Sequence, residues 1–184
     1  MITAVEGSDD YSDYDVKINL YDINRNETVC DLEIKSSFPL SCKISSSGFF
    51  IVCKDELINY ETDGKEINTF SFNGRTVTDF ELTYDKAVLL FDNSGYDISY
   101  TLVALNESST VLYENEITST VYDIEICGNS TCLLVDNRVL VLNPQGERMI
   151  HIDISATGSR LLAYNDHVLY LCTDSAAPLF DIQE

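Results

Sequence analysis

The sequence contains no tryptophan, only three prolines and only two histidines among its 184 residues. No apolar run approaches the roughly 18 residues that span a bilayer. The acidic start, MITAVEGSDDYSDYD, is not that of a signal peptide. We therefore expect no membrane insertion by this chain. No C-x-x-C pair occurs and no cysteine stands at ligand spacing from His151 or His167, so we expect no metal site.

Basic residues are also scarce. Lysine and arginine total 11 against 31 aspartates and glutamates, which gives a formal net charge of −20. Such a field repels phosphate backbones, so we expect no nucleic-acid partner, and it favours cations and basic protein surfaces. The alternative is that many of these carboxylates simply solvate turns and strand edges. The 45% hydrophobic content is enough for a folded core.

Helical periodicity is nearly absent, and short apolar runs bounded by Gly, Asn, Asp or Ser take its place. Examples of these runs are GFFIVCKD, KAVLLFDN, STCLLVDN and HVLYLCTD. Turn signals stand between such runs, as at Asp63-Gly64 and in the segment from Asn143 to Gly146. This pattern predicts an all-β protein.

The runs belong to an internal repeat. Four segments align without a gap, at successive offsets of 38, 44 and 37: residues 38–53, 76–91, 120–135 and 157–172. Each reads as a hairpin, and a second hairpin follows each of the first three. Four strands in a period of about 40 residues predict the blade of a β-propeller, with strands A to D from the centre outward.

We interpret the whole chain as one partial propeller domain of about four to five four-stranded antiparallel blades. The first expected blade, residues 1–37, supplies strands B to D, and the last, residues 157–184, supplies strands A to C. We therefore expect part of a larger propeller of seven or eight blades, which self-associates through open blade edges. A closed five-bladed ring is the alternative. The expected blades are 1–37, 38–75, 76–119, 120–156 and 157–184.

Two repeat segments carry a family resemblance, NRVLVLNPQGERMIHIDI and STVYDIEICGNSTCLLV. They resemble quinoprotein-like, WD40-like propeller repeats. More narrowly, they are similar to a membrane-anchored propeller family of Gram-positive bacteria with no established activity. The resemblance covers essentially the whole chain and implies a bacterial, extracytoplasmic location at the cell surface, although this chain lacks the anchor. The cytoplasm is the alternative if the resemblance does not hold. Quinoprotein dehydrogenases carry tryptophan-docking motifs, so this tryptophan-free chain is expected to hold no such cofactor.

Four cysteines stand at informative places in the repeat. Cys53 and Cys172 share a column with Phe and Val, which predicts that both lie in the core as small hydrophobic residues. Cys127 and Cys132 flank the sequence GNST and are expected to lie opposite one another across a hairpin. A disulfide and two reduced thiols both remain open for that pair.

The innermost strand offers a column of charged residues. Asp79, Asp123 and Arg160 are equivalent in three successive repeats, and Glu81 and Glu125 share a second column. Carboxylates repeated on the axial strands can line a central channel and bind a cation, or pair with Arg160. The alternative is that they accept backbone hydrogen bonds or are solvated at the channel mouth.

The loops between strands B and C supply a second candidate surface, and they are acidic. Tyrosine among charges is a common recognition composition, so we expect the first of these loops to bind a protein partner. Weak calcium binding and a merely solvated loop are the alternatives. The candidate residues in this loop are Asp9, Asp10, Tyr11, Asp13, Tyr14 and Asp15.

No catalytic group can be assigned, because no serine or cysteine nucleophile can be placed with His151 or His167. We therefore expect a non-catalytic platform that binds a protein or a ligand, with a basic protein as the favoured partner. The alternative is a fragment of an enzyme, or of a sugar- or metal-binding propeller, whose functional residues lie on other blades.

Overall fold

The computed structural model describes most of the chain. The described residues are 2–7, 14–35, 37–44, 48–93, 95, 97–154, 158–173 and 176–182, and the side chains of 2–7, 14, 15, 158 and 159 are not among the described features. The chain divides into two compact units. Unit 1 is Met1–Thr76 with Glu107–Thr110, and unit 2 is Val77–Asn106 with Val111–Glu184.

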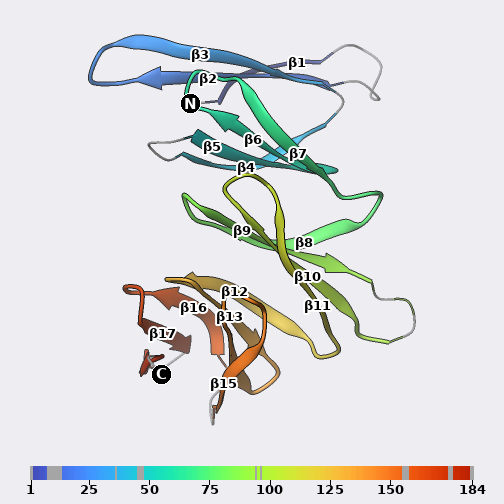
Figure 1. Ribbon diagram of the computed structural model, residues 1–184, viewed down its shortest axis with the longest axis vertical. Coiled ribbons are helices and arrows are strands. Elements are labelled where there is room, and N and C mark those ends of the chain that lie inside the picture. Colours follow the sequence, from blue (N-terminus) through green and yellow to red (C-terminus); the bar gives the residue numbers. More distant parts are fainter. Residues whose placement is uncertain are drawn as a thin grey trace. The chain divides into compact units, whose positions relative to one another are not determined.

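The described elements are all strands, and they form five antiparallel sheets of consecutive strands (Figure 1). Three sheets have four strands and two have three. The all-β propeller prediction is confirmed at this level. The described part of the chain holds no helix long and apolar enough to cross a membrane.

Unit 1 contains two of these sheets. The first has the order β1-β2-β3 and the second the order β4-β5-β6-β7. Short turns join the strands, and Asp63 at the β6–β7 turn accepts the Lys65 N–H. The strands are β1 (Ile2–Gly7), β2 (Tyr14–Asp22), β3 (Glu27–Ile34), β4 (Pro39–Ile44), β5 (Gly48–Cys53), β6 (Glu56–Glu61) and β7 (Glu66–Ser71).

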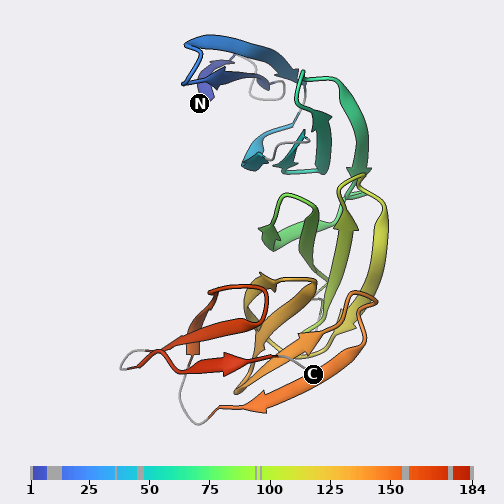
Figure 2. The same ribbon diagram turned by 60° about the vertical axis from the view of Figure 1, so that its left-hand side comes forward.

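Unit 2 contains the other three sheets, each a meander of hairpins (Figure 2). The first consists of β8 (Thr76–Leu82), β9 (Lys86–Asp92), β10 (Tyr100–Asn106) and β11 (Val111–Ile117). The second consists of β12 (Val121–Cys127), β13 (Ser130–Val135), β14 (Arg138–Leu142) and β15 (Arg148–Asp153). The third consists of β16 (Gly158–Ala163), β17 (Val168–Thr173) and β18 (Leu179–Asp181).

The core lies between neighbouring sheets, which explains the continuous apolar runs. In β13, Leu133 and Val135 pack against the sheet β8–β11, while Cys132 and Leu134 pack against the sheet β16–β18. Both faces of the strand are therefore buried, and the alternation of apolar and polar residues typical of a half-exposed strand is absent. In unit 1, a separate core joins β2 and β3 to β5 and β6.

The cysteine expectations hold only in part. Cys53 is buried in the core of unit 1. Cys172 is only half-buried, because Leu169 and Leu171 occupy the face of β17 that packs on the neighbouring sheet. The expectation that Cys127 and Cys132 lie opposite one another is wrong. A two-residue loop joins β12 to β13, so Cys127 pairs with Ser130 and Cys132 lies opposite Glu125. Both thiols are free.

Candidate functional site

Four candidates of the acidic B–C loop lie outside the described residues: Asp9, Asp10, Tyr11 and Asp13. The other two candidates of that loop, at positions 14 and 15, begin β2, and their side chains are not described. Binding through this loop therefore stays a prediction. The inner-strand candidates, by contrast, all lie in unit 2.

The inner strands β8, β12 and β16 bring the candidate column together. Side chains two residues apart share a face of a strand, so each strand presents its charged residues in a row. All four carboxylates are half-buried and the arginine is exposed. We call this group the acidic cluster, and it consists of Asp79, Glu81, Asp123 and Glu125 with Arg160.

Asp123 shows how the cluster contributes to the fold. Its Oδ2 accepts the backbone N–H of Leu161 at 2.5 Å, so a carboxylate of β12 satisfies a donor on β16. Asp79 instead accepts the N–H of its neighbour Phe80 at 2.9 Å. Glu125 accepts the backbone N–H of Ala163 on β16, so the structure shows bonding to the backbone for three of the four carboxylates. Bonded in this way, they still keep further acceptor capacity.

Electrostatics sets the acidic cluster apart from ordinary surface carboxylates. Burial, followed by the charge of Glu81, raises the pKa of Glu125 to about 7, although the Ala163 N–H and Arg160 act in the opposite direction. Burial also raises the pKa of Asp79 and of Asp123, and Arg160 lowers both. One guanidinium thus acts on Asp79, Asp123 and Glu125, which are also subject to repulsion within the cluster. The described residues contain no group of three or more His, Cys, Asp or Glu arranged to hold a metal ion.

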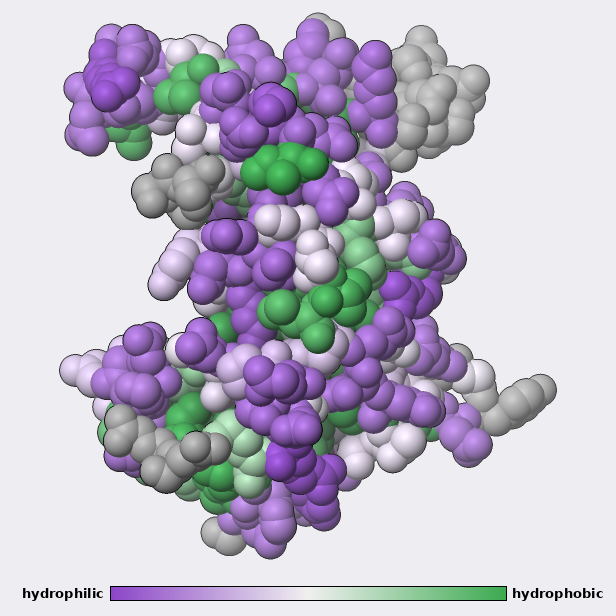
Figure 3. All heavy atoms as spheres, viewed as in Figure 1, coloured by the Kyte–Doolittle hydropathy of each residue, from purple (hydrophilic) through white to green (hydrophobic). Residues whose placement is uncertain are grey.

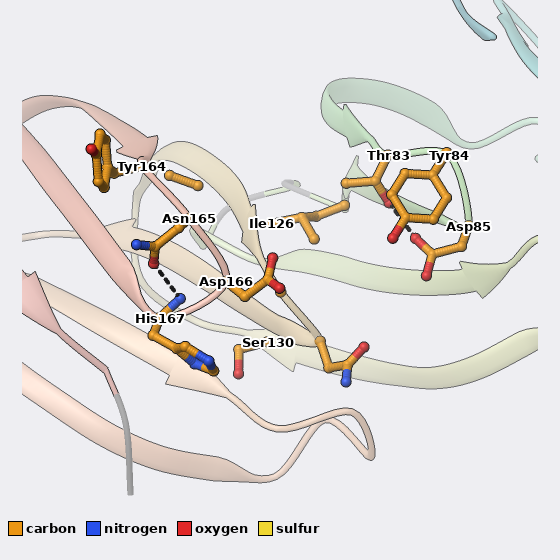
Figure 4. A pocket seen from close by; sticks show the side chains of 12 residues that line it. Thr83, Tyr84, Asp85, Ile126, Ser130, Tyr164, Asn165, Asp166 and His167 are labelled. Carbon is orange, nitrogen blue, oxygen red and sulfur yellow. Dashed lines mark hydrogen bonds between the residues drawn. The ribbon is translucent and has the colours of Figure 1, made fainter. Parts of the chain in front are cut away.

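A pocket of about 410 Å³ opens at the end of the same three strands. Three hairpin turns build it, those of β8–β9, β12–β13 and β16–β17 (Figure 4). We call it the turn pocket. Its lining residues are Thr83, Tyr84, Asp85, Ile126, Gly128, Asn129, Ser130, Ala163, Tyr164, Asn165, Asp166 and His167.

Specific contacts hold two of these turns close together. Gly128 has φ +57°, and a Cβ there would lie 2.7 Å from the backbone oxygen of Asp166, so only glycine fits. Beside it, the Cys127 thiol donates to the backbone oxygen of Asn165 at 3.0 Å. Burial, followed by the charges of Glu125 and Asp166, raises the pKa of that thiol to about 11. The group therefore remains a protonated donor at neutral pH.

Lys86 connects the β8–β9 turn, the third turn of the pocket, to the β12–β13 hairpin. This lysine is buried, and its Nζ donates to the backbone oxygen of Asn129 at 3.1 Å and to Thr131 Oγ1 at 2.9 Å. Tyr113 also donates its hydroxyl to Thr131 Oγ1, at 2.6 Å. Burial lowers the pKa of Lys86 to about 8. The ammonium group is thus committed to holding the sheet β8–β11 against the β12–β13 hairpin.

The sequence reasoning missed the turn pocket, although a signal was present. The turn segments TYDK (83–86), CGNS (127–130) and YNDH (164–167) are aligned in the repeat. Reading the three tetrapeptides as neighbours in space would have indicated a polar, tyrosine-bearing site. The visible surface of both units is mostly hydrophilic (Figure 3), so hydropathy alone does not distinguish this pocket.

No protein-family model matches the sequence, and no curated protein sequence matches it. Among solved structures, the chain is similar to BamB from Moraxella catarrhalis, with a TM-score of 0.62 and 15% identity over 96% of this chain and 56% of that one. The WD40 domain of SCAP from fission yeast gives a TM-score of 0.58 and 12% identity, over 98% and 49%.

A chain of a mitotic checkpoint complex is also similar, with a TM-score of 0.63 and 11% identity over 97% of this chain and 60% of that one. The chain thus spans about half to three-fifths of the lengths of these three structures. At such identities the likeness shows the fold alone. The five sheets described here are blades of the β-propeller type.

Proposed function

We propose that this protein is a non-catalytic platform for a protein partner, and that the acidic cluster of unit 2 receives a basic group of that partner. The observation that carries the proposal is the gathering of four half-buried carboxylates around one arginine on the inner strands. A basic side chain placed there would neutralise charge that the chain itself leaves in excess.

A stability argument supports this reading. Burial, followed by repulsion from Glu81, disfavours the charged form of Glu125, so the native state is less stable with that carboxylate ionised. Binding sites typically contain accessible groups that lower the stability of the native state. One similar structure is a chain within a mitotic checkpoint complex, so the fold takes part in a protein assembly in that case.

The acidic loop with Tyr11 and Tyr14 would provide a second contact. In this proposal its charges steer a basic partner toward the protein, and the tyrosines anchor it, because aromatic residues carry more interface energy than rim charges. Steering of this kind weakens as salt rises, since exposed charges are screened over about 8–10 Å. A cell-surface location, as in the resembling Gram-positive family, belongs to the same proposal.

The test uses a photo-reactive phenylalanine in place of Tyr122, which is 56% exposed and precedes Asp123 on β12. We expect crosslinking in living cells to trap a partner with a basic surface. The double variant Asp79→Asn/Glu81→Gln should abolish the crosslink. These substitutions are nearly isosteric, and they leave intact the two carboxylates that bond to the backbone of β16.

The matched control is Asp97→Asn/Asp153→Asn, which removes the same charge from two exposed positions of unit 2 outside the cluster. The control should keep the crosslink. If both double variants lose it equally, only net charge matters and the cluster is not the binding site. If no protein is trapped at this position, the proposal is wrong.

A further inference from the structure

We propose that the turn pocket binds the side chain of an arginine, an inference that rests on the protein-binding function proposed above and identifies a further, more specific contact with that partner. The pocket lies in unit 2, where β8, β12 and β16 end. Its volume of about 410 Å³ is within the roughly 300–1,000 Å³ range of ligand pockets.

The lining of the pocket carries negative charge, which favours a cationic ligand. None of its twelve lining residues is lysine or arginine, whereas Asp85 and Asp166 both line it. The nearest lysine in the sequence, Lys86, directs its ammonium group to Asn129 O and Thr131 Oγ1. Apart from the imidazole of His167, the lining therefore has no side chain that could balance these two carboxylates.

The two carboxylates also have free acceptor capacity. Asp85 accepts one hydrogen bond through Oδ1, from the Thr83 hydroxyl at 2.8 Å, which leaves Oδ2 open. The carboxylate of Asp166 makes no hydrogen bond or ion pair with any residue that the structure describes. Figure 4 shows Asp166 near the middle of the lining residues, with Asn165 on one side of it and Asp85 on the other. A guanidinium has five N–H donors and can serve more than one such acceptor.

The tyrosines at the pocket favour arginine over lysine. Tyr84 is 67% exposed and Tyr164 is 71% exposed, both large values for aromatic side chains. They stand on different turns on two sides of the pocket (Figure 4), and Tyr164 is held edge-on to Tyr170 with ring centroids 5.9 Å apart. A planar, weakly hydrated guanidinium stacks on aromatic faces, and its aliphatic stem covers their apolar area.

The pocket is formed before any ligand arrives. The close approach of Gly128 to Asp166, the Cys127 thiol bond and the Lys86 bonds fix the three turns relative to one another. Binding then need not order three separate loops, which lowers its entropic cost. This makes weak binding of a short peptide measurable.

The test is an NMR titration of the uniformly ¹⁵N-labelled full chain with the peptide acetyl-Gly-Arg-Gly-amide. The matched probe is the same peptide with citrulline, which is neutral and nearly the same shape. We expect amide shifts at Gly128, Asn129, Asp166 and His167 with the arginine peptide. The citrulline peptide should bind roughly tenfold more weakly, as for the loss of one charge-assisted hydrogen-bonded pair.

Variants locate the site. Asp166→Asn should weaken arginine-peptide binding about fivefold or more, and Tyr84→Ala should do the same through lost stacking. The control Asp153→Asn removes an equal charge from an exposed position of β15 and should change the affinity by less than about twofold. Unchanged far-UV circular dichroism and an unchanged urea midpoint show that each variant is folded.

Equal binding of the arginine and citrulline peptides would overturn the inference, as would equal weakening by Asp153→Asn. Shifts at these four amides with glucose or maltose, and none with the arginine peptide, would make the pocket a sugar site instead. The two proposals fail separately. If a partner crosslinks at Tyr122 and the peptide does not bind, only the arginine pocket is wrong. If the peptide binds and no partner crosslinks, the pocket stands and the platform proposal is wrong.

Discussion

The inner strand β4 of unit 1 and the inner strand β12 of unit 2 occupy the same place in the repeat but differ in burial. Ile44 is 55% exposed, whereas Ile126, its equivalent, is 5% exposed. Ile126 packs against the sheet β8–β11, which has its own inner strand. The described sheet that precedes β4 has the order β1-β2-β3. The burial of an inner strand thus depends on the sheet beside it, as in repeat proteins that are stabilised by contacts between neighbouring repeats.

The largest expected effect comes from truncating this matched pair of isoleucines. Ile126→Ala should lower the free energy of unfolding by about 2–4 kcal/mol, because it removes buried methyl groups and leaves a cavity. Ile44→Ala should change it by less than about 0.5 kcal/mol, as expected for an exposed position. Urea unfolding followed by circular dichroism measures both. Equal losses for the two variants would contradict the comparison.

The next effect concerns Lys86, whose equivalent in unit 1 is Gly48. Lys86→Met keeps the apolar stem but removes the bonds to Asn129 O and Thr131 Oγ1, so it should cost about 1–3 kcal/mol. The loss should grow with pH. The pKa of Lys86 is about 8 in the folded state and 10.5 in the unfolded state, so between pH 8 and pH 10.5 the unfolded state binds more protons. The wild type therefore gains stability relative to the variant as the pH rises through this range.

Urea unfolding of the wild type and the Lys86→Met variant at pH 7.5 and pH 10 measures this dependence. The titration of all other groups is common to both proteins and cancels in the difference. A difference that stays constant with pH would show that the ammonium is fully solvated in the folded state.

Glu125 provides a smaller, pH-dependent effect, and unit 1 has Lys43 at the equivalent position. The folded pKa of Glu125, about 7, is raised above the ordinary value of 4.5, chiefly by burial. Its stabilising contribution is therefore fully present below pH 4.5 and is lost as the pH rises through 7. Glu125→Gln should remove this loss and make the protein more stable than the wild type at pH 7.5.

Hydrogen exchange at pH 5 and pH 7.5 can assign that gain to a region of the chain. The wild type and Glu125→Gln should differ in protection at the amides of β12 and β16, and not at those of β4 and β5. A gain spread evenly over both units would mean that the repulsion among these carboxylates is not local.

The smallest effect on the fold is expected from thiol modification. Burial raises the pKa of both thiols, but Cys42 lies exposed on β4 whereas Cys132 is buried and out of reach of the reagent. Iodoacetamide at pH 8 should therefore alkylate Cys42 first and leave stability nearly unchanged. Peptide mass spectrometry over time measures the order. Faster reaction of Cys132 would show that β13 opens to solvent in the folded protein.

The sequence permitted prediction of the blades because strand periodicity is local. The run STCLLVDN predicted a strand, and its continuous apolar character indicated burial on both faces, as β13 has. The alignment of Asp79, Asp123 and Arg160 likewise predicted that these residues meet on the inner strands. Local pattern and repeat period together were sufficient for both results.

Loop length and contacts between sheets were not predictable in this way. The segment GNST fits either a two-residue or a four-residue loop, and the difference moves Cys132 from Cys127 to Glu125. The turn pocket depends on three turns about 40 residues apart. Their alignment in the repeat places them in equivalent positions but does not indicate that their side chains form one pocket. The bond from Leu161 N–H to Asp123 also joins two different sheets, so no single segment of sequence indicates it.

The close approach at Gly128 limits how the repeats can be exchanged in evolution or engineering. The aligned residue in the preceding repeat is Tyr84, and a side chain at φ +57° in the β12–β13 turn would run into the backbone of Asp166. Duplicating the 76–119 segment in place of 120–156 would therefore disrupt the adjoining turn, although both segments follow one pattern. The fit between Gly128 and Asp166 is specific to these two turns, and a consensus sequence averaged over the repeats would lose it.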